Sequence, residues 1–279
     1  MPLRFVLLLS LLAPAALLGG EGRNLDPVPR LDPADAKVQR WAVVIGISAY
    51  QDPKIARLRY AEADAKAFAA FLQSPQGGSQ PADRLRLLVD ADATLEAVRT
   101  ALADFLKQAQ EDDIVLIFFA GHGAPEPGRA DTAYLLCHDT KVDRLYATAF
   151  PMDEMRTILQ KRIFARRVLV IADACHAGGI ATAGLRADTK TASQVTTRVL
   201  QAIGKESQPG ALPKGAPGRA ILMSCAEGEL SQEDARWGGG HGVFTHFLLD
   251  GLKGRAADKN ADGLLDLQEL YDYVRPEVS

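Results

Sequence analysis

Residues 114–123 have the sequence IVLIFFAGHG, in which seven apolar residues run directly into Gly-His-Gly. A run of that length, rich in β-branched and aromatic residues, is typical of a strand buried on both faces of a parallel sheet. A second such run, VLVIA at 168–172, leads into Asp173-Ala174-Cys175-His176. Because ligands bind at the carboxyl ends of parallel strands, we expect His122 and Cys175 to meet at one edge of the sheet.

The rest of the chain alternates between strand-like and helix-like patterns. This alternation predicts an α/β fold with parallel strand pairing, right-handed crossovers and helices on both faces of the sheet. The predicted strands are 41–47, 84–89, 113–120, 133–137, 167–172 and 219–225, and the predicted helices are 61–72, 95–108, 152–161, 242–252 and 267–274.

The composition and length suit one globular domain, here over residues 41–279, and two smaller domains are the alternative. The net charge is -3, and no basic stripe interleaved with aromatic residues is present, which argues against nucleic-acid binding. The chain has three cysteines, an odd number that does not suit a disulfide framework. Cys137 and Cys225 lie in apolar runs and are interpreted as small buried residues, which singles out Cys175.

The N-terminal segment predicts export. Arg4 precedes a short apolar stretch that ends at Gly19-Gly20, so residues 1–20 are interpreted as a signal peptide. The alternative is an uncleaved membrane anchor, although the stretch is shorter than the roughly 20 residues that span a bilayer. Residues 21–40 form a linker. We therefore expect a secreted or periplasmic protein with no stable membrane insertion after signal removal.

A cysteine thiol needs a base to become a good nucleophile at neutral pH. His122 is the candidate base for Cys175, and the backbone N–H groups of Gly123 and Cys175 are candidates to bind an oxyanion. The alternatives are a structural histidine and a buried thiol, but the joint pattern favours a catalytic dyad. His176, next to Cys175, is the weaker candidate for the base, and we interpret His138, His241 and His246 as surface or packing residues.

The segments around these residues resemble the caspase-type peptidases, in particular the bacterial metacaspase-like (orthocaspase-like) branch. The resemblance rests on WAVVIGI at 41–47, FFAGHG at 118–123, DACHAGG at 173–179 and GVFT at 242–245. It implies a caspase-like fold with a central, mostly parallel six-stranded sheet. It also implies a Cys175–His122 dyad and a place for Asp173 in the pocket for the residue before the cut. An anionic pocket favours Arg or Lys, whereas the alternative for Asp173 is capping of a turn.

Further pocket residues follow from the same resemblance. Metacaspases carry an acidic residue directly after a Ser-Cys or Gly-Cys pair, but here Ala226 follows Ser224-Cys225. Glu227 and Glu229 are therefore the nearby candidates for that role. Trp237 lies where caspases use an aromatic wall for the next subsite, and its alternative role is that of a core residue.

Residues 180–218 form a long segment without a strand pattern, directly after Cys175. In the family that the chain resembles, this position is often cut by the enzyme itself. We expect self-cleavage after Arg186, Lys190 or Arg198, because nicking concentrates in exposed loops. The alternative is an ordinary flexible loop.

Residues 258–269 match the EF-hand calcium loop. Gly263 stands at the sharp turn, and flanking helical patterns suit the motif. A solvated acidic turn is the alternative. The predicted oxygen ligands are Asp258, Asn260, Asp262, the Leu264 carbonyl, Asp266 and Glu269.

These inferences predict an exported cysteine endopeptidase that cuts proteins or peptides after Arg or Lys. We expect a monomer in which bound calcium fixes the C-terminal helix and supports the central sheet. One alternative is a legumain- or gingipain-type peptidase with another preference for the residue before the cut. The other is a non-catalytic caspase-like module that binds partners in a calcium-dependent way.

Overall fold

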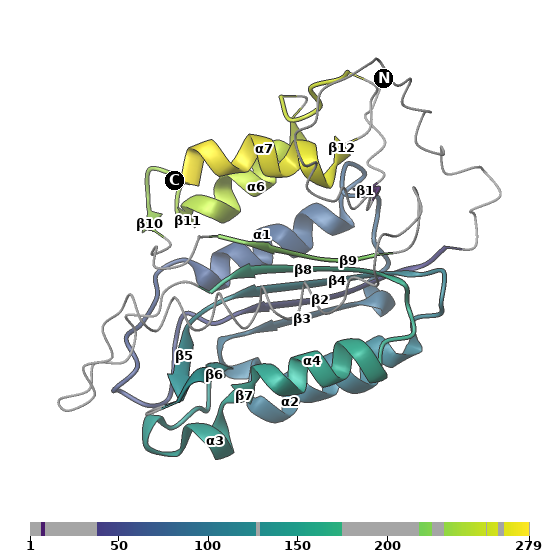
Figure 1. The fold of residues 1–279 in the computed structure, drawn as a ribbon. Helices are drawn as coiled ribbons and strands as arrows, with labels where there is room; N and C mark the ends of the chain where they lie inside the picture. The colour runs from purple at the N-terminus through teal and green to yellow at the C-terminus, as the bar shows by residue number, and fades with distance from the viewer. Residues whose placement is uncertain are drawn as a thin grey trace, which may run out of the picture.

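The computed structural model describes residues 7–8, 38–126, 129–174, 218–224, 232–254, 256–261 and 265–278. Within these ranges the centre is a parallel sheet with the strand order β3-β2-β4-β8-β9 (Figure 1). Its strands are β2 (Arg40–Gly46), β3 (Leu85–Val89), β4 (Ile114–Ala120), β8 (Arg167–Asp173) and β9 (Arg219–Met223).

The apolar run at 114–120 forms β4, the middle strand of this sheet. All seven residues of β4 are buried, because β2 and β8 pair with its two edges while helices cover both of its faces. Such a strand has no solvent side and needs no alternation of polar and apolar residues. The fold places the C-terminal ends of β4 and β8 side by side.

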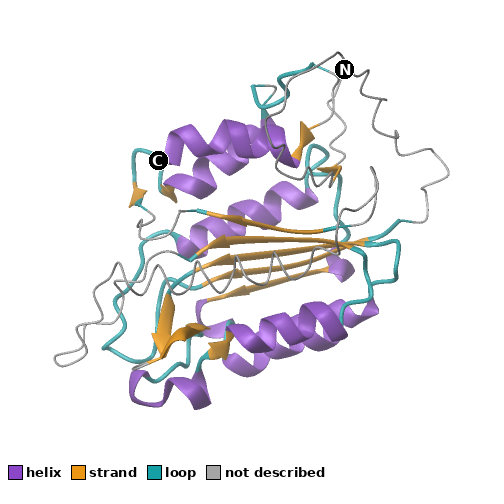
Figure 2. Cartoon of the chain, in the orientation of Figure 1, coloured by secondary structure: helices purple, strands orange, loops and turns teal. Residues whose placement is uncertain are grey.

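Helices cover both faces of the sheet (Figure 2). Alternate residues of β2 divide between them: Ala42 and Val44 pack on the side of α1, α6 and α7, whereas Val43 and Ile45 pack on the side of α2 and α4. The helices are α1 (Ala61–Gln73), α2 (Leu95–Arg99) with its continuations η4 (Thr100–Phe105) and η5 (Leu106–Gln108), α4 (Met152–Lys161), α6 (Val243–Lys253) and α7 (Leu267–Val278).

The described part of the central sheet has five strands, so the predicted count of six is not confirmed. The segment 133–137 falls largely within β6, which belongs to a separate antiparallel sheet with the order β5-β6-β7. The neighbouring sheet contains β5 (Gly123–Glu126), β6 (Arg129–Leu135) and β7 (Phe150–Pro151). It lies at the C-terminal end of the central strands, and the sequence analysis did not predict β5 or β7.

Short elements complete the described structure. β1 (Leu7–Leu8) pairs in parallel with β12 (Leu265–Asp266), and β10 (Glu233–Asp234) pairs antiparallel with β11 (His241–Gly242). None of the described helices is long and apolar enough to cross a bilayer. The remaining short helices are α3 (Leu145–Thr148), η2 (Ala82–Arg84), η3 (Asp90–Asp92) and η6 (Val142–Arg144).

Candidate active site

The register of β4 against β8 brings the two predicted catalytic segments together. Ala120, the last residue of β4, lies opposite Asp173, the last residue of β8, and the N–H of Gly121 donates to the carbonyl of Asp173 over 3.1 Å. His122 and Cys175 each follow two residues after these paired ends. Figure 1 shows both strands pointing to the end of the molecule where β5 begins. Cys175 itself lies outside the described residues.

His122 is a buried residue whose backbone and ring are both held by the loop between β2 and α1. Its Nε2 lies 2.9 Å from the carbonyl oxygen of Ala56, and its backbone N–H donates over 2.9 Å to the hydroxyl of Tyr50. The Tyr50 ring also stacks on the imidazole, with ring centroids 5.4 Å apart. The sequence analysis did not anticipate either contact.

These contacts fix which nitrogen of His122 carries a proton. A carbonyl oxygen only accepts hydrogen bonds, so Nε2 must donate to Ala56. In the neutral imidazole the lone pair then resides on Nδ1, which makes Nδ1 the nitrogen that can accept a proton from an acid. The arrangement suits a general base whose orientation is set by a backbone carbonyl.

Asp173 is almost fully buried, with 1% of its surface exposed. Its Oδ2 accepts a hydrogen bond of 3.1 Å from the hydroxyl of Thr245 on α6. An ionised carboxylate buried at the end of a strand requires such partners, or a cation, to offset the loss of hydration. This position is compatible with the predicted role of Asp173 at the base of a pocket.

A second buried carboxylate, that of Asp64 on α1, lies close to Gly242, as does that of Asp173. Its Oδ2 accepts the backbone N–H of Gly242 over 3.0 Å, and a Cβ added to Gly242 would lie 3.1 Å from that oxygen and 2.8 Å from Oδ2 of Asp173. Burial, with the charge of Asp173, raises the pKa of Asp64 to about 6, and the hydrogen bond from His241 opposes this rise. We call Asp64 and Asp173 the carboxylate pair.

Asp64 was not predicted as a site residue, although the sequence contains a signal for it. Asp64 stands on the apolar face of α1 next to Ala61, Ala65 and Phe68, all of which are buried. A charged residue on the buried face of an amphipathic helix has no packing reason to be there. The interpretation of His241 as a surface or packing residue was also wrong, because its Nδ1 lies 2.6 Å from Oδ1 of Asp64.

The other predicted site residues are only partly placed. Gly123 is buried at the start of β5, where it pairs with Leu135. Trp237 is half-buried in the turn between β10 and β11, with the Arg236 guanidinium 5.7 Å from its ring, so its alternative role as a core residue is wrong. The predicted residues outside the described part of the chain are Cys175, Glu227, Glu229, Arg186, Lys190, Arg198, Asp262 and Leu264.

The described half of the predicted calcium loop has the geometry of a helix start. Oδ1 of Asp266 accepts the backbone N–H of Glu269 over 2.8 Å, which caps α7. The buried Glu269 carboxylate turns back over the loop, where it accepts the N–H groups of Asn260 and Asp266 over 3.3 and 3.2 Å. Among the described residues, no group of three or more His, Cys, Asp or Glu side chains is placed to hold a metal ion.

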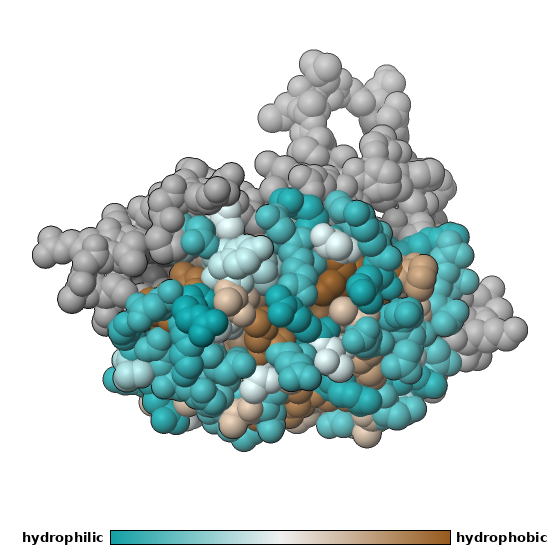
Figure 3. All heavy atoms as spheres, turned by 90° about the horizontal axis from the view of Figure 1, so that it is seen from below, coloured by the Kyte–Doolittle hydropathy of each residue, from teal (hydrophilic) through white to brown (hydrophobic). Residues whose placement is uncertain are grey.

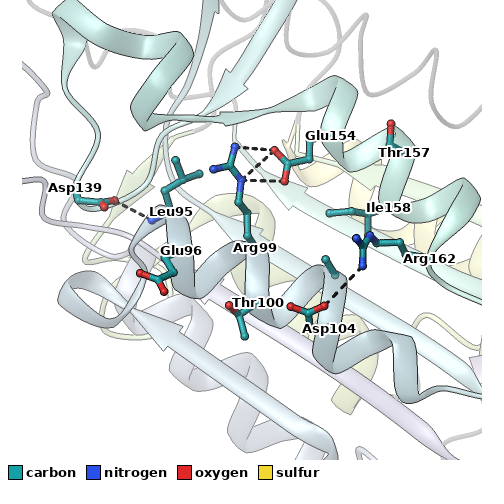
Figure 4. A pocket seen from close by; sticks show the side chains of 11 residues that line it. Leu95, Glu96, Arg99, Thr100, Asp104, Asp139, Glu154, Thr157, Ile158 and Arg162 are labelled. Carbon is teal, nitrogen blue, oxygen red and sulfur yellow. Dashed lines mark hydrogen bonds and ion pairs between the residues drawn. The ribbon is translucent and has the colours of Figure 1, made fainter.

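A separate hollow of about 620 Å³ lies between α2 and α4 on the opposite face of the sheet. Figure 3 shows this face as largely hydrophilic, with apolar side chains between the polar ones. Two ion pairs line the hollow: Arg99 binds both oxygens of Glu154, and Arg162 lies 3.7 Å from Asp104 (Figure 4). The hollow contains no His or Cys, so it is not the candidate active site.

Comparisons with known proteins agree with this geometry. The sequence profile of the family described as "Caspase domain" matches residues 39–279. Metacaspase-4 of Arabidopsis thaliana is 28% identical over 148 residues, which cover 50% of this chain and 34% of that protein. Metacaspase-6 of the same plant is 27% identical over 148 residues, or 50% of this chain and 38% of that protein. The chain thus spans little more than a third of the length of these curated relatives.

A solved structure shares the fold. The crystal structure of a Geobacter sulfurreducens protein superposes with a TM-score of 0.51 over 77% of this chain and 82% of that chain, at 24% identity. The likeness supports a caspase-like α/β architecture with a central, mostly parallel sheet.

Proposed function

Because the chain belongs to the caspase domain family, we propose that it is a cysteine-type endopeptidase that hydrolyses peptide bonds after Arg or Lys. On this proposal its partners are protein and peptide substrates. The nucleophile is Cys175, the base is His122, and the carboxylate pair receives the basic side chain of the residue before the cut.

The observation that carries the preference for basic residues is the burial of two carboxylates next to one glycine. Gly242 has no side chain, and a Cβ there would collide with Oδ2 of Asp173 at 2.8 Å. Two carboxylates held close together repel one another, and a cation between them would relieve that repulsion. A guanidinium or an ammonium group at contact distance is worth about 4 kcal/mol at an effective dielectric constant of about 20.

The proposed reaction has two steps. Nδ1 of His122 takes the proton of the Cys175 thiol, and the thiolate attacks the carbonyl carbon of the substrate. The backbone N–H groups of Gly123 and Cys175 stabilise the oxyanion that forms. His122 then gives its proton to the leaving amine as the C–N bond breaks, which leaves a thioester on Cys175. Water attacks this thioester to release the acid and regenerate the thiol.

Fluorogenic peptides that end in Arg, Lys, Asn or Asp test the proposal. We expect cleavage after Arg and Lys by the wild-type protein and none by Cys175→Ala. Asp173→Asn should lower kcat/KM for the Arg peptide by about 10² to 10³, because it removes one charge from a buried ion pair. A preference for Asn or Asp would favour a legumain-type peptidase instead. Failure of Cys175 to react with an Arg-directed electrophile, together with no cleavage, would favour a binding module.

Self-processing is a further part of the proposal. Arg186, Lys190 and Arg198 follow the nucleophile in sequence and have the side chains that the carboxylate pair would accept. We expect intact-mass spectra of the wild-type protein to show a cut after one of them, and the Cys175→Ala protein to stay whole. Equal processing of both proteins would show that another protease makes the cut.

Calcium is proposed to bind the loop 258–269. The loop offers only oxygen donors, and the Glu269 carboxylate already turns over it toward Asn260. The ion would hold the start of α7 against the loop. Calorimetry should show calcium heat for the wild-type protein and little for Glu269→Gln, with Gln268→Ala as the neighbouring control. An unchanged heat in Glu269→Gln would remove the assignment.

Export and a monomeric state complete the proposal. The apolar segment within residues 1–20 has the pattern of a signal peptide. Expression in a bacterial host should yield a mature chain that starts near residue 21 in the exported fraction. Gel filtration of that chain should give a mass below 30.0 kDa. A mature chain that retains Met1, or a dimer at micromolar concentration, would contradict these two points.

A further inference from the structure

His241 makes an ion-pair contact with the carboxylate pair. It lies on β11, and its Nδ1 is 2.6 Å from Oδ1 of Asp64 on α1, 177 residues away in sequence. The side chains are 18% and 4% exposed, so water screens the contact only weakly. Gly242, the next residue, donates its N–H to the other oxygen of Asp64. Residues 241–242 therefore bind both oxygens of one carboxylate.

In the described part of the chain, Asp64 is the carboxylate in ion-pair contact with His241. Asp234 lies directly opposite His241 in the pairing of β10 with β11. On α6, His246 stacks at a centroid distance of 6.4 Å. On β10, Asp234 pairs with Arg236, and the Glu233 carboxylate accepts the N–H groups of Arg59 and Tyr60 at the start of α1. On β8, Asp173 lies beyond Gly242 and accepts from Thr245.

We propose that His241 is a specificity-determining residue that sets the net charge of the carboxylate pair and thereby makes the affinity for a basic side chain depend on pH. This inference rests on the proposed function, because it assigns the carboxylate pair to substrate. It adds a residue and a regulation that the proposed function does not contain.

The charge of the site changes in two steps. When His241 and Asp64 both carry their protons, the positive imidazolium balances Asp173 and the site is neutral. Loss of one of these protons leaves one net negative charge, and loss of both leaves two. Each step should strengthen the binding of a cation by about tenfold, because the desolvation of the cation offsets most of its direct attraction to one more negative charge.

The test compares two peptide amides of the same shape, one ending in Arg and the other in the neutral analogue citrulline. Their binding to the full chain carrying Cys175→Ala is measured by calorimetry from about pH 5 to pH 8. The ratio of the two affinities isolates the contribution of the positive charge.

We expect the ratio to rise about 100-fold with pH in the parent protein, in two proton steps. In His241→Asn, which keeps a donor near Nδ1 but cannot titrate, the ratio should rise in one step. At the acid end it should exceed the ratio of the parent protein about tenfold. His246→Asn is the matched control and should follow the parent protein. A lower ratio at every pH with an unchanged profile would show a merely structural role and would overturn the inference.

Two further outcomes separate this inference from the proposed function. If the Arg peptide never binds better than the citrulline peptide, the carboxylate pair is not a pocket for basic residues, and both proposals fail. If it binds better but His241→Asn has the profile of the parent protein, only the role of His241 fails. If His241→Asn does not fold, the pH profile of the parent protein is the test. A rise of the affinity ratio with the loss of one proton instead of two would also contradict the inference.

Discussion

Replacing Asp64 by Asn should stabilise the folded protein at neutral pH while weakening cleavage after Arg. The variant removes a buried negative charge but keeps a side chain of the same shape. The amide oxygen can still accept the N–H of Gly242, which Oδ2 of Asp64 accepts over 3.0 Å. The amide NH2 takes the place of Oδ1, which lies 2.6 Å from Nδ1 of His241, and can donate to that nitrogen when the imidazole is neutral. The variant therefore removes the charge while it keeps the hydrogen bond from Gly242 and changes the one with His241.

The magnitude follows from the pKa of Asp64. Burial raises this pKa from 3.8 in the unfolded chain to about 6 in the folded protein. The folded state thus binds more protons between these two values, so the free energy of unfolding falls as the pH rises through this window. At about 1.4 kcal/mol per pKa unit, the ionised Asp64 destabilises the fold by roughly 3 kcal/mol above pH 6. Allowing for a weaker contact with His241, we expect Asp64→Asn to gain about 2 kcal/mol.

The assay is thermal unfolding in the Cys175→Ala background, which prevents self-cleavage. At about pH 8 the Asp64→Asn protein should melt about 4 to 8 °C above its parent, given roughly 2 to 4 °C per kcal/mol for a domain of this size. At about pH 4 the two proteins should melt together, because the folded parent then carries a protonated, neutral Asp64. Asp83→Asn, which changes an exposed carboxylate, is the control.

Two results would refute the reasoning. A difference in melting temperature that is the same at both pH values would show that the charge of Asp64 is not its cause. A variant that melts below its parent at the higher pH would show that the hydrogen bonds of Asp64, and not its desolvation, dominate. In the active background, Asp64→Asn should lower kcat/KM for the Arg peptide by at least tenfold, as expected for the loss of one charge near a cation.

Three other changes have definite expectations. Tyr50→Phe removes the acceptor of the His122 N–H, so kcat for the Arg peptide should fall about tenfold with little change in KM, and an unchanged kcat would contradict a positioning role. Asp113→Ala removes a buried carboxylate that accepts three N–H groups, from Gln39, Gln110 and the Trp41 ring. Denaturant unfolding should therefore show that the free energy of unfolding falls by about 3 to 5 kcal/mol. The control Asp112→Ala changes an exposed neighbour and should not show this fall. Burial raises the pKa of the Cys137 thiol to about 12, so mass spectrometry after treatment with iodoacetamide at about pH 8 should find Cys137 unmodified until the protein is unfolded.

The elements of the central layers follow from local patterns. The strands at 114–120 and 167–173 and the helices at 61–73 and 152–161 agree with their predicted bounds to within one residue. Buried strands are uniformly apolar, and helices that cover them have apolar residues every three or four positions. The residue pattern of a segment therefore indicates its type of secondary structure. The burial of Cys137 was predicted for the same reason and is confirmed.

The short strands at the edge of the molecule were not predictable in this way. β5 includes Pro125, and β10 and β11 have two residues each, so none of them has a periodic pattern. Their pairing comes from the position of the chain segments around the end of the central sheet. The central sheet has one strand fewer in the described part than the resemblance implied, because β6 pairs with β5 and β7 instead.

The sequence by itself determined the α/β architecture, the strand ends that carry His122 and Asp173, and the choice of Cys175 as the candidate nucleophile. Only the tertiary structure decided that Tyr50 and Ala56 hold the imidazole, and that Asp64 joins Asp173 and His241. The physical reason is the range of the interactions. Periodicity reports how one segment meets solvent and core, whereas these contacts join segments 66 to 177 residues apart and arise from strand register and helix packing.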